Sequence, residues 1–149
     1  MRLGGQISRS CVTLRIAGDS LVPSEVTASM GTQPTHSHAM GERISPRVSS
    51  LRKSGMWMLE FSEKSGQVEE QLSMLLDLIP PESTWLELQR EFETDLVCSV
   101  TASGDSQGFS LSQATIEQLS RLKIDVMFEV WVDLDEEADG TGDPVETSN

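Results

Sequence analysis

The stretch that decides the fold is residues 123–133, with the sequence KIDVMFEVWVD. One residue in two is strongly apolar, and this period of two is typical of a β-strand with one buried face. The apolar positions are Ile124, Val126, Phe128, Val130 and Val132, and they alternate with Lys123, Asp125, Met127, Glu129, Trp131 and Asp133. We therefore predict a strand whose first set packs under helices and whose second set faces away from them.

Three other stretches show the same alternation and predict three more strands, at residues 11–16, 56–61 and 93–103. Each has one apolar face, formed by Val12, Leu14, Ile16, then Trp57, Leu59, Phe61, and then Leu96, Cys98, Val100, Ala102. A further short extended piece is expected at residues 109–111.

Between the strands, apolar residues recur every three or four positions, which predicts amphipathic helices at residues 23–30, about 66–79, 83–92 and after Ser112. Pro23 suits the first turn of the first helix, and Gly31 suits its C-terminal end. Ser112 is the expected N-cap of the last helix.

The resulting order is β-α-β-α-(α)-β-α-β. No strand is apolar on both faces, as a sheet covered on both sides would require. We therefore predict an α+β fold, a two-layer sandwich with a mixed or antiparallel sheet of about four to five strands and helices on one face.

Composition divides the chain into segments. Residues 1–10 are expected to be an N-terminal extension, residues 11–134 a single α+β domain, and residues 135–149 an acidic disordered tail. Within the domain, residues 32–55 are rich in Ser, Thr, Gly, Pro, Arg and His. They predict a long polar loop, either functional or disordered.

The charge limits the classes of function. The chain has 24 acidic and 11 basic residues among 149, for a net charge of −13. This balance disfavours binding to nucleic acid or to an anionic membrane surface. The N-terminus lacks the apolar stretch of a secretory signal, so a cytoplasmic location is expected. Cys11 and Cys98 are expected to be buried free thiols, and they could form a disulfide only on adjacent strands in register.

Several short motifs together resemble a known bacterial family. They are Leu14-x-Ile16-x-Gly18-Asp19-x-Leu21-x-Pro23, Met30-Gly31-x-x-Pro34-Thr35, Gly41-Glu42, Ser54-Gly55-Met56-Trp57, and Phe109–Ser112 with the Ile124-Asp125-Val126 strand. Over residues 11–132 the chain resembles the bacterial domain-of-unknown-function family 4279, which implies the same fold but offers no established activity to carry over. Val22 departs from that family's usual Asp, so Ser20 or Asp19 is expected to cap the first helix.

The residues do not form a recognisable catalytic, cofactor or metal motif, so we expect a protein that is not an enzyme and takes no cofactor and no metal. His36-Ser37-His38 has the spacing of a metal-binding pair but no third ligand. The glycines do not match a nucleotide-binding loop, and no serine lies in a hydrolase elbow.

The tryptophans differ in their surroundings. Trp57 and Trp85 lie on apolar faces and are expected in the core, whereas Trp131 lies on the polar side of its strand. An exposed Trp among charges is a common anchor for a partner. The expected partner-binding residues are Trp131, Met127, Glu129, Asp133 and Arg15. The alternative is that the tail or the segment 32–55 folds over them.

Three hypotheses for function follow. The first is a non-enzymatic interaction module for a basic protein, one version of which is an immunity-type protein that neutralises a basic toxin. The second is a small-molecule site in which residues 32–55 form a lid over an anionic ligand. Its binding residues would be Arg43, Arg47, Arg52, Lys53, His36 and His38. The third is self-association through the open face or a strand edge, and the oligomeric state is left open.

Overall fold

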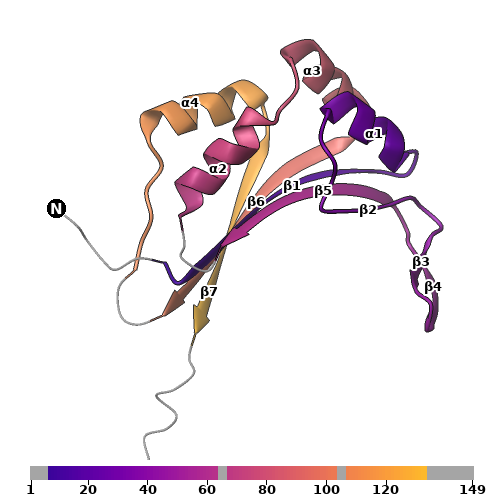
Figure 1. The fold of residues 1–149 in the computed structure, drawn as a ribbon, viewed down its shortest axis with the longest axis horizontal. Coiled ribbons are helices and arrows are strands. Elements are labelled where there is room, and N and C mark those ends of the chain that lie inside the picture. The colour runs from indigo at the N-terminus through magenta and orange to yellow at the C-terminus, as the bar shows by residue number, and fades with distance from the viewer. Residues whose placement is uncertain (1–6, 64–66, 104–106, 134–149) are drawn as a thin grey trace, which may run out of the picture.

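The computed structural model describes residues 7–63, 67–103 and 107–133. These residues form an arched sheet with the helices gathered on its convex side (Figure 1). The elements are β1 (Arg9–Gly18), α1 (Pro23–Met30), β2 (His36–His38), β3 (Arg43–Ser45), β4 (Val48–Leu51), β5 (Gly55–Glu63), α2 (Val68–Asp77), α3 (Glu82–Glu91), β6 (Glu93–Ser103), α4 (Gln113–Leu122) and β7 (Asp125–Asp133). The expected acidic tail, residues 135–149, lies outside the described residues.

The main sheet has five strands in the order β2-β5-β1-β6-β7. The pairs β2·β5, β1·β5 and β1·β6 are antiparallel, and β6·β7 is parallel. The parallel pair follows from α4, because two parallel strands need a crossover connection between them. The predicted α+β class, with a mixed sheet and helices on one face, is therefore confirmed.

The core lies between the sheet and the helices, where the alternation of each central strand predicted it. The helix-side residues of β1, β5 and β6 are buried, and Val12, Leu14, Ile16, Trp57, Leu96 and Cys98 are fully inaccessible. Trp57 and Trp85 are both core residues, as predicted. Their indole Nε1 atoms donate to Thr27 Oγ1 and to the backbone oxygen of Leu122, each at 3.0 Å.

Burial begins earlier in the chain than the sequence suggested. β1 starts at Arg9, and Ile7 is only 4% exposed and packs in the core. Ser10 is also buried, and its hydroxyl donates to Oε1 of the buried Gln71 at 2.8 Å. Gln71 Nε2 returns a hydrogen bond to the Ser10 carbonyl at 3.2 Å. The core therefore includes residues that composition assigned to an N-terminal extension.

Two of the helix ends agree with the sequence and one does not. Gly31 follows α1 in the left-handed conformation with φ 71°, and the Ser112 hydroxyl accepts the amide of Thr115 at the start of α4. The expected cap of α1 by Ser20 or Asp19 is wrong. Val22 occupies the N-cap position without a side-chain hydrogen bond, and Pro23 follows it at the first turn. Since proline has no amide hydrogen, one fewer donor there needs a cap.

The long polar loop predicted for residues 32–55 is also wrong, because this segment contains β2 and the β3–β4 hairpin. β2 pairs with β5, with His36 opposite Met58 and His38 opposite Met56. The hairpin projects from the end of the sheet on the side away from the helices (Figure 1). Its residues are mostly exposed on both faces, so the sequence has no apolar alternation to reveal these strands.

Two smaller differences concern the segment before α4 and the thiols. Residues 108–112 form no strand, although an extended piece was expected at 109–111. Cys11 is only half-buried, which corrects the prediction of two buried thiols, and Cys98 is buried. Both are free, and they lie on opposite faces of the sheet because Cys11 pairs with Ser99 while Cys98 pairs with Val12.

Candidate protein-interaction surface

The second face of the sheet carries no helix (Figure 1). We call it the open face. The strand registers arrange its side chains in rows across the sheet, and one row runs through all five strands of the main sheet. In order from β2 to β7, this row is His36, Met58, Arg15, Asp95 and Asp125. The open face therefore brings residues from distant parts of the sequence side by side.

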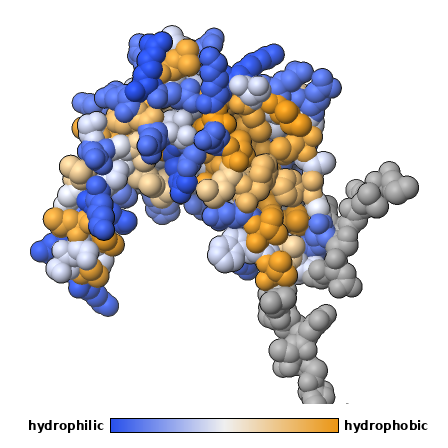
Figure 2. All heavy atoms as spheres, turned by 180° about the vertical axis from the view of Figure 1, so that it is seen from behind, coloured by the Kyte–Doolittle hydropathy of each residue, from blue (hydrophilic) through white to orange (hydrophobic). Residues whose placement is uncertain are grey.

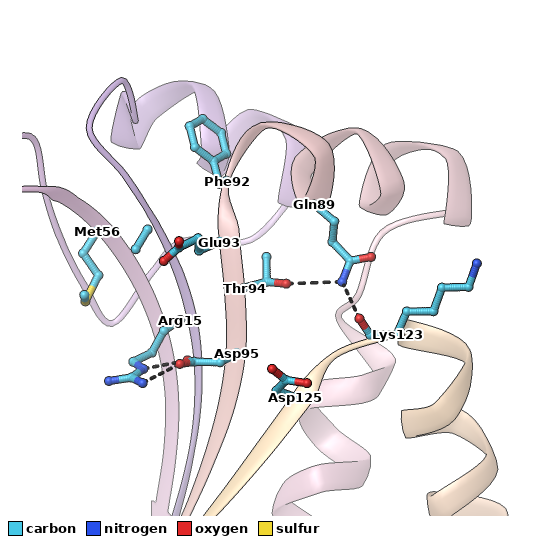
Figure 3. A pocket seen from close by; sticks show the side chains of 10 residues that line it. Arg15, Met56, Gln89, Phe92, Glu93, Thr94, Asp95, Lys123 and Asp125 are labelled. Atoms are coloured by element: carbon cyan, nitrogen blue, oxygen red, sulfur yellow. Dashed lines mark hydrogen bonds and ion pairs between the residues drawn. The ribbon is translucent and has the colours of Figure 1, made fainter.

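An ion pair stands at the centre of this row. Arg15 donates from Nε to Asp95 Oδ1 at 2.7 Å and from Nη2 to Oδ2 at 2.5 Å (Figure 3). Both side chains are 35% exposed, so the pair is partly shielded from water. Hydrogen bonding to Asp95 raises the pKa of Arg15, which keeps the guanidinium charged. The guanidinium of Arg15 is therefore already paired within the domain.

Beside the pair, the surface is hollowed by about 710 Å³ at the end of the sheet where β1 ends and β6 and β7 begin. Gln89 ties this region together, since its Nε2 donates to Thr94 Oγ1 and to the Lys123 carbonyl, both at 3.2 Å (Figure 3). The charged residues that line the hollow are two cations and three carboxylates: Arg15, Lys123, Glu93, Asp95 and Asp125. The mixture of signs does not select an anion.

β7 carries the most exposed apolar side chains of the open face. Met127 is 48% exposed and Trp131 is 62% exposed. Glu129 lies between them on the same face and is exposed, and Asp125 is exposed at the start of the strand. The sequence therefore placed Met127, Glu129 and Trp131 together correctly. Asp133 ends β7 at the next position on this face, and its side chain is outside what the structure describes.

A comparison with family models decides which family this fold belongs to. The model described as "Domain of unknown function (DUF4279)" matches residues 6–133. The chain belongs to the DUF4279 family. This confirms the resemblance drawn from the sequence motifs, and the match includes every strand and helix of the structure. Neither the curated proteins nor the solved structures gave a match.

The opposite face of β7 holds the apolar residues that the alternation of the sequence predicts to lie under helices. In the DUF4279 domain, Phe128, Val130 and Val132 are 46%, 63% and 61% exposed. Phe128 stacks on Phe109, with ring centroids 5.8 Å apart. Figure 2 shows hydrophobic residues reaching the surface on the side of the molecule that holds α2, α4 and β7. β7 therefore exposes large apolar side chains on both of its faces.

Arg15 lies apart from Met127, Glu129 and Trp131. It lies on β1, in the row of Asp125, whereas Trp131 lies in the row of Arg9 and Thr101 near the other end of the sheet. Of the five partner-binding residues expected from the sequence, the structure thus gathers those of β7 and sets Arg15 apart. The segment 32–55 does not cover Trp131 either, because it adds β2 to the far edge of the sheet.

The residues expected to hold an anion lie at that far edge. His36 is exposed and His38 is half-buried on β2, and Arg43 is exposed on β3. Arg47 and Lys53 are exposed, and Arg52 is half-buried after β4. The Nδ1 atom of His38 and the Nε atom of Arg52 are buried without a hydrogen-bond partner among the described residues. In that same part of the chain, no three His, Cys, Asp or Glu side chains gather as a metal site would require.

Three other groups have shifted pKa values. Burial raises the pKa of Cys98 to about 11, and burial also raises the pKa of Cys11. Hydrogen bonds from Ser112 and then Thr115 lower the pKa of Glu69. None of these three groups lies on β7. As for the helices, none within the described ranges is long and apolar enough to cross a membrane.

Proposed function

We propose that this DUF4279 domain is a non-enzymatic protein-interaction module that binds a basic partner through the open-face side chains of β7. One observation carries the proposal: Met127 and Trp131 are 48% and 62% exposed on either side of Glu129, on a face without a helix. Large exposed apolar side chains are costly in water unless a partner covers them, and Trp is among the residues that contribute most to binding.

Electrostatics support a partner that is basic. The open side of β7 alternates acidic and apolar residues, with Asp125 and Glu129 both exposed. The whole chain carries a net charge of −13, which attracts a cationic protein and raises its rate of association. The positive charge of Arg15 does not weaken this attraction, because the ion pair with Asp95 neutralises it. A basic toxin domain bound by an immunity-type protein is one partner of this chemistry.

The test uses three variants as bait against a lysate, at low and then moderate salt. Glu129→Lys and Trp131→Ser alter the proposed surface, and Glu87→Lys is the matched control because Glu87 is an exposed residue of α3. We expect the wild type and Glu87→Lys to retain one basic protein in stoichiometric amounts. Glu129→Lys and Trp131→Ser should bind it at least tenfold more weakly. Equal capture by all four proteins would exclude β7 as the binding surface.

A second candidate function is the binding of an anionic ligand at the far edge of the sheet. The unpartnered Nδ1 of His38 and Nε of Arg52 favour it, since buried nitrogen atoms of this kind ordinarily find an acceptor. Exposed Arg43 and Arg47 would add positive charge. Titration with pyrophosphate, followed by the NMR shifts of residues 36–53, tests it. Saturable shifts that Arg52→Gln removes would support this site, and a linear, nonspecific response would exclude it.

A further inference from the structure

β7 occupies an edge of the sheet, and its outer edge has no paired strand among the described residues. Such an edge presents a row of free amide and carbonyl groups that another strand can pair with. Native proteins ordinarily protect their edges by shortness, charge or a covering segment. β2, the other edge, follows this rule, since it is three residues long and reads His-Ser-His. β7 is nine residues long.

The side chains of β7 also differ from those of a protected edge. On the helix side, Phe128, Val130 and Val132 are exposed by about half or more, and Phe109 beside Phe128 is 38% exposed and extends that surface. On the open side, Met127 and Trp131 are equally accessible. A partner that merely covered the open face would leave the helix-side residues in water. A strand laid along the edge covers both sets at once.

We propose that β7 binds its partner by strand addition, so that an extended segment of a basic protein becomes the sixth strand of the sheet. This inference rests on the proposed function and specifies its partner. The register of a β-sheet places side chains of paired residues on the same face. The partner strand therefore carries apolar residues opposite Val126, Phe128, Val130 and Val132. On its other face, basic residues opposite Asp125 and Glu129 alternate with apolar residues opposite Met127 and Trp131.

Charge argues against a second copy of this chain as the occupant. In an antiparallel pair of β7 strands with full overlap, Glu129 lies opposite its own copy and Asp125 lies opposite Asp133. Like charges directly opposite one another are destabilising. A shift by two residues separates them but shortens the overlap, and two chains of net charge −13 repel at any register. Residues 134–149 include six acidic and no basic residues, so they lack the complementary charge.

The experiment uses the full chain and a synthetic nine-residue peptide with blocked ends. The peptide has lysine at its first, fifth and ninth positions, leucine at its third and seventh, and valine at the four others. This pattern matches β7 in either strand direction. A second peptide replaces the lysines with glutamates. Two more peptides carry N-methyl groups on the odd-numbered or on the even-numbered amides, which blocks pairing along one edge and leaves the side chains in place.

We expect the lysine peptide to bind at least tenfold more tightly than the glutamate peptide, as measured by calorimetry or fluorescence anisotropy. One of the two N-methylated peptides should lose binding by at least tenfold while the other keeps it. The N-methylated peptide that loses binding shows whether the added strand runs parallel or antiparallel to β7. Glu129→Lys should weaken the lysine peptide, and Glu87→Lys should not.

The outcomes separate this inference from the proposed function. If the lysine peptide binds but both N-methylated forms bind equally well, strand addition is wrong while a basic partner for β7 stands. If the lysine and glutamate peptides bind alike, or neither binds, strand addition is wrong, and the capture experiment with Glu129→Lys and Trp131→Ser decides the proposed function by itself. Sedimentation of the chain alone completes the test. A stable dimer that Val130→Lys dissociates would assign the β7 edge to a second copy and overturn the inference.

Discussion

Arg15 and Asp95 face each other across the β1–β6 pair and form a two-pronged ion pair on the open face, with both contacts between 2.5 and 2.7 Å. The fork of a guanidinium matches the two oxygens of a carboxylate, so this geometry is the strongest that such a pair adopts. Since each side chain is 35% exposed, water screens part of the attraction.

This geometry predicts a measurable but modest stabilisation. We expect Arg15→Met and Asp95→Asn each to lower the free energy of unfolding, and a double-mutant cycle to give a coupling energy of about 0.5–1 kcal/mol. Urea unfolding of the four proteins measures it. Raising the salt concentration should reduce the coupling. A coupling near zero at low salt would mean that the pair does not stabilise the fold.

The buried Ser10–Gln71 pair links β1 to α2 and gives a larger effect. Each residue donates one hydrogen bond to the other, at 2.8 and 3.2 Å, and both are at most 3% exposed. Ser10→Ala removes the donor to Gln71 Oε1 and should cost about 1–3 kcal/mol, because a buried acceptor is left without a partner. The control is Ser8→Ala, since the Ser8 hydroxyl bonds only a partly buried carbonyl. Equal losses for the two variants would contradict this account.

The glycine pair at the end of the β1–β5 ladder predicts a steric effect. Gly18 and Gly55 lie opposite each other, and a Cβ on Gly55 would stand 2.8 Å from the Gly18 carbonyl oxygen and 3.0 Å from Leu21 Cβ. Gly55→Ala should therefore destabilise the domain by about 1–3 kcal/mol in urea unfolding. Gly31→Asn is the control. Gly31 has open space and φ 71°, which Asn tolerates, so a smaller loss is expected there.

These glycines show why the sequence was informative about the central strands. β1, β5 and β6 each bury one face, and burial imposes the period of two that Val12, Leu14 and Ile16 display. The motif residues Gly18 and Gly55 pair at the end of one ladder, and both leave no room for a Cβ, which would meet the Phe92 ring at Gly18 and the Gly18 carbonyl oxygen at Gly55. By contrast, β2 and the β3–β4 hairpin are exposed on both sides, so no physical constraint gives their residues a pattern.

The exposed surface of β7 could be predicted from the sequence only in part, because a strand shows which residues share a face but not which of them a helix covers. Alternation identifies the face on which Val130 lies, but it does not say how far the helices reach. The helices have eight to ten residues and β7 has nine. At about 1.5 Å per helical residue and about 3.3 Å per strand residue, a helix covers roughly half of such a strand. The short predicted helices were therefore the available signal that Val130 and Val132 would be left exposed.

The two cysteines should differ in reactivity. Burial raises the pKa of Cys98 to about 11, so almost none of it is thiolate at pH 8, and the buried side chain is also shielded from reagents. Cys11 also has a raised pKa, but it is half-buried and reachable. We expect N-ethylmaleimide to modify Cys11 slowly and Cys98 only in denaturant, as mapped by mass spectrometry of peptides. Rapid modification of Cys98 in the folded protein would contradict its burial, and a Cys11–Cys98 disulfide would contradict the placement of the two thiols on opposite faces of the sheet.

Glu69 gives the stability of the domain a specific dependence on pH. Its Oε1 accepts the Ser112 amide at 2.5 Å and the Thr115 hydroxyl at 2.9 Å, which joins α2 to the start of α4. These hydrogen bonds lower its pKa in the folded state, so folding favours the ionised form. The stabilisation is therefore complete above the unfolded-state pKa of about 4.3 and is lost as the pH falls through the lower folded-state value.

Glu69→Gln removes the charge and should remove this dependence. We expect the variant to be less stable than the wild type at pH 6–7, and the difference to shrink as the pH is lowered below about 4. Thermal unfolding at pH 7, 5, 4 and 3 measures it, with Glu87→Gln as the control on an exposed helix position. A difference that stays constant or grows on acidification would show that Glu69 acts through packing, and that the carboxylate to which Ser112 and Thr115 donate does not stabilise the α2–α4 contact through its charge.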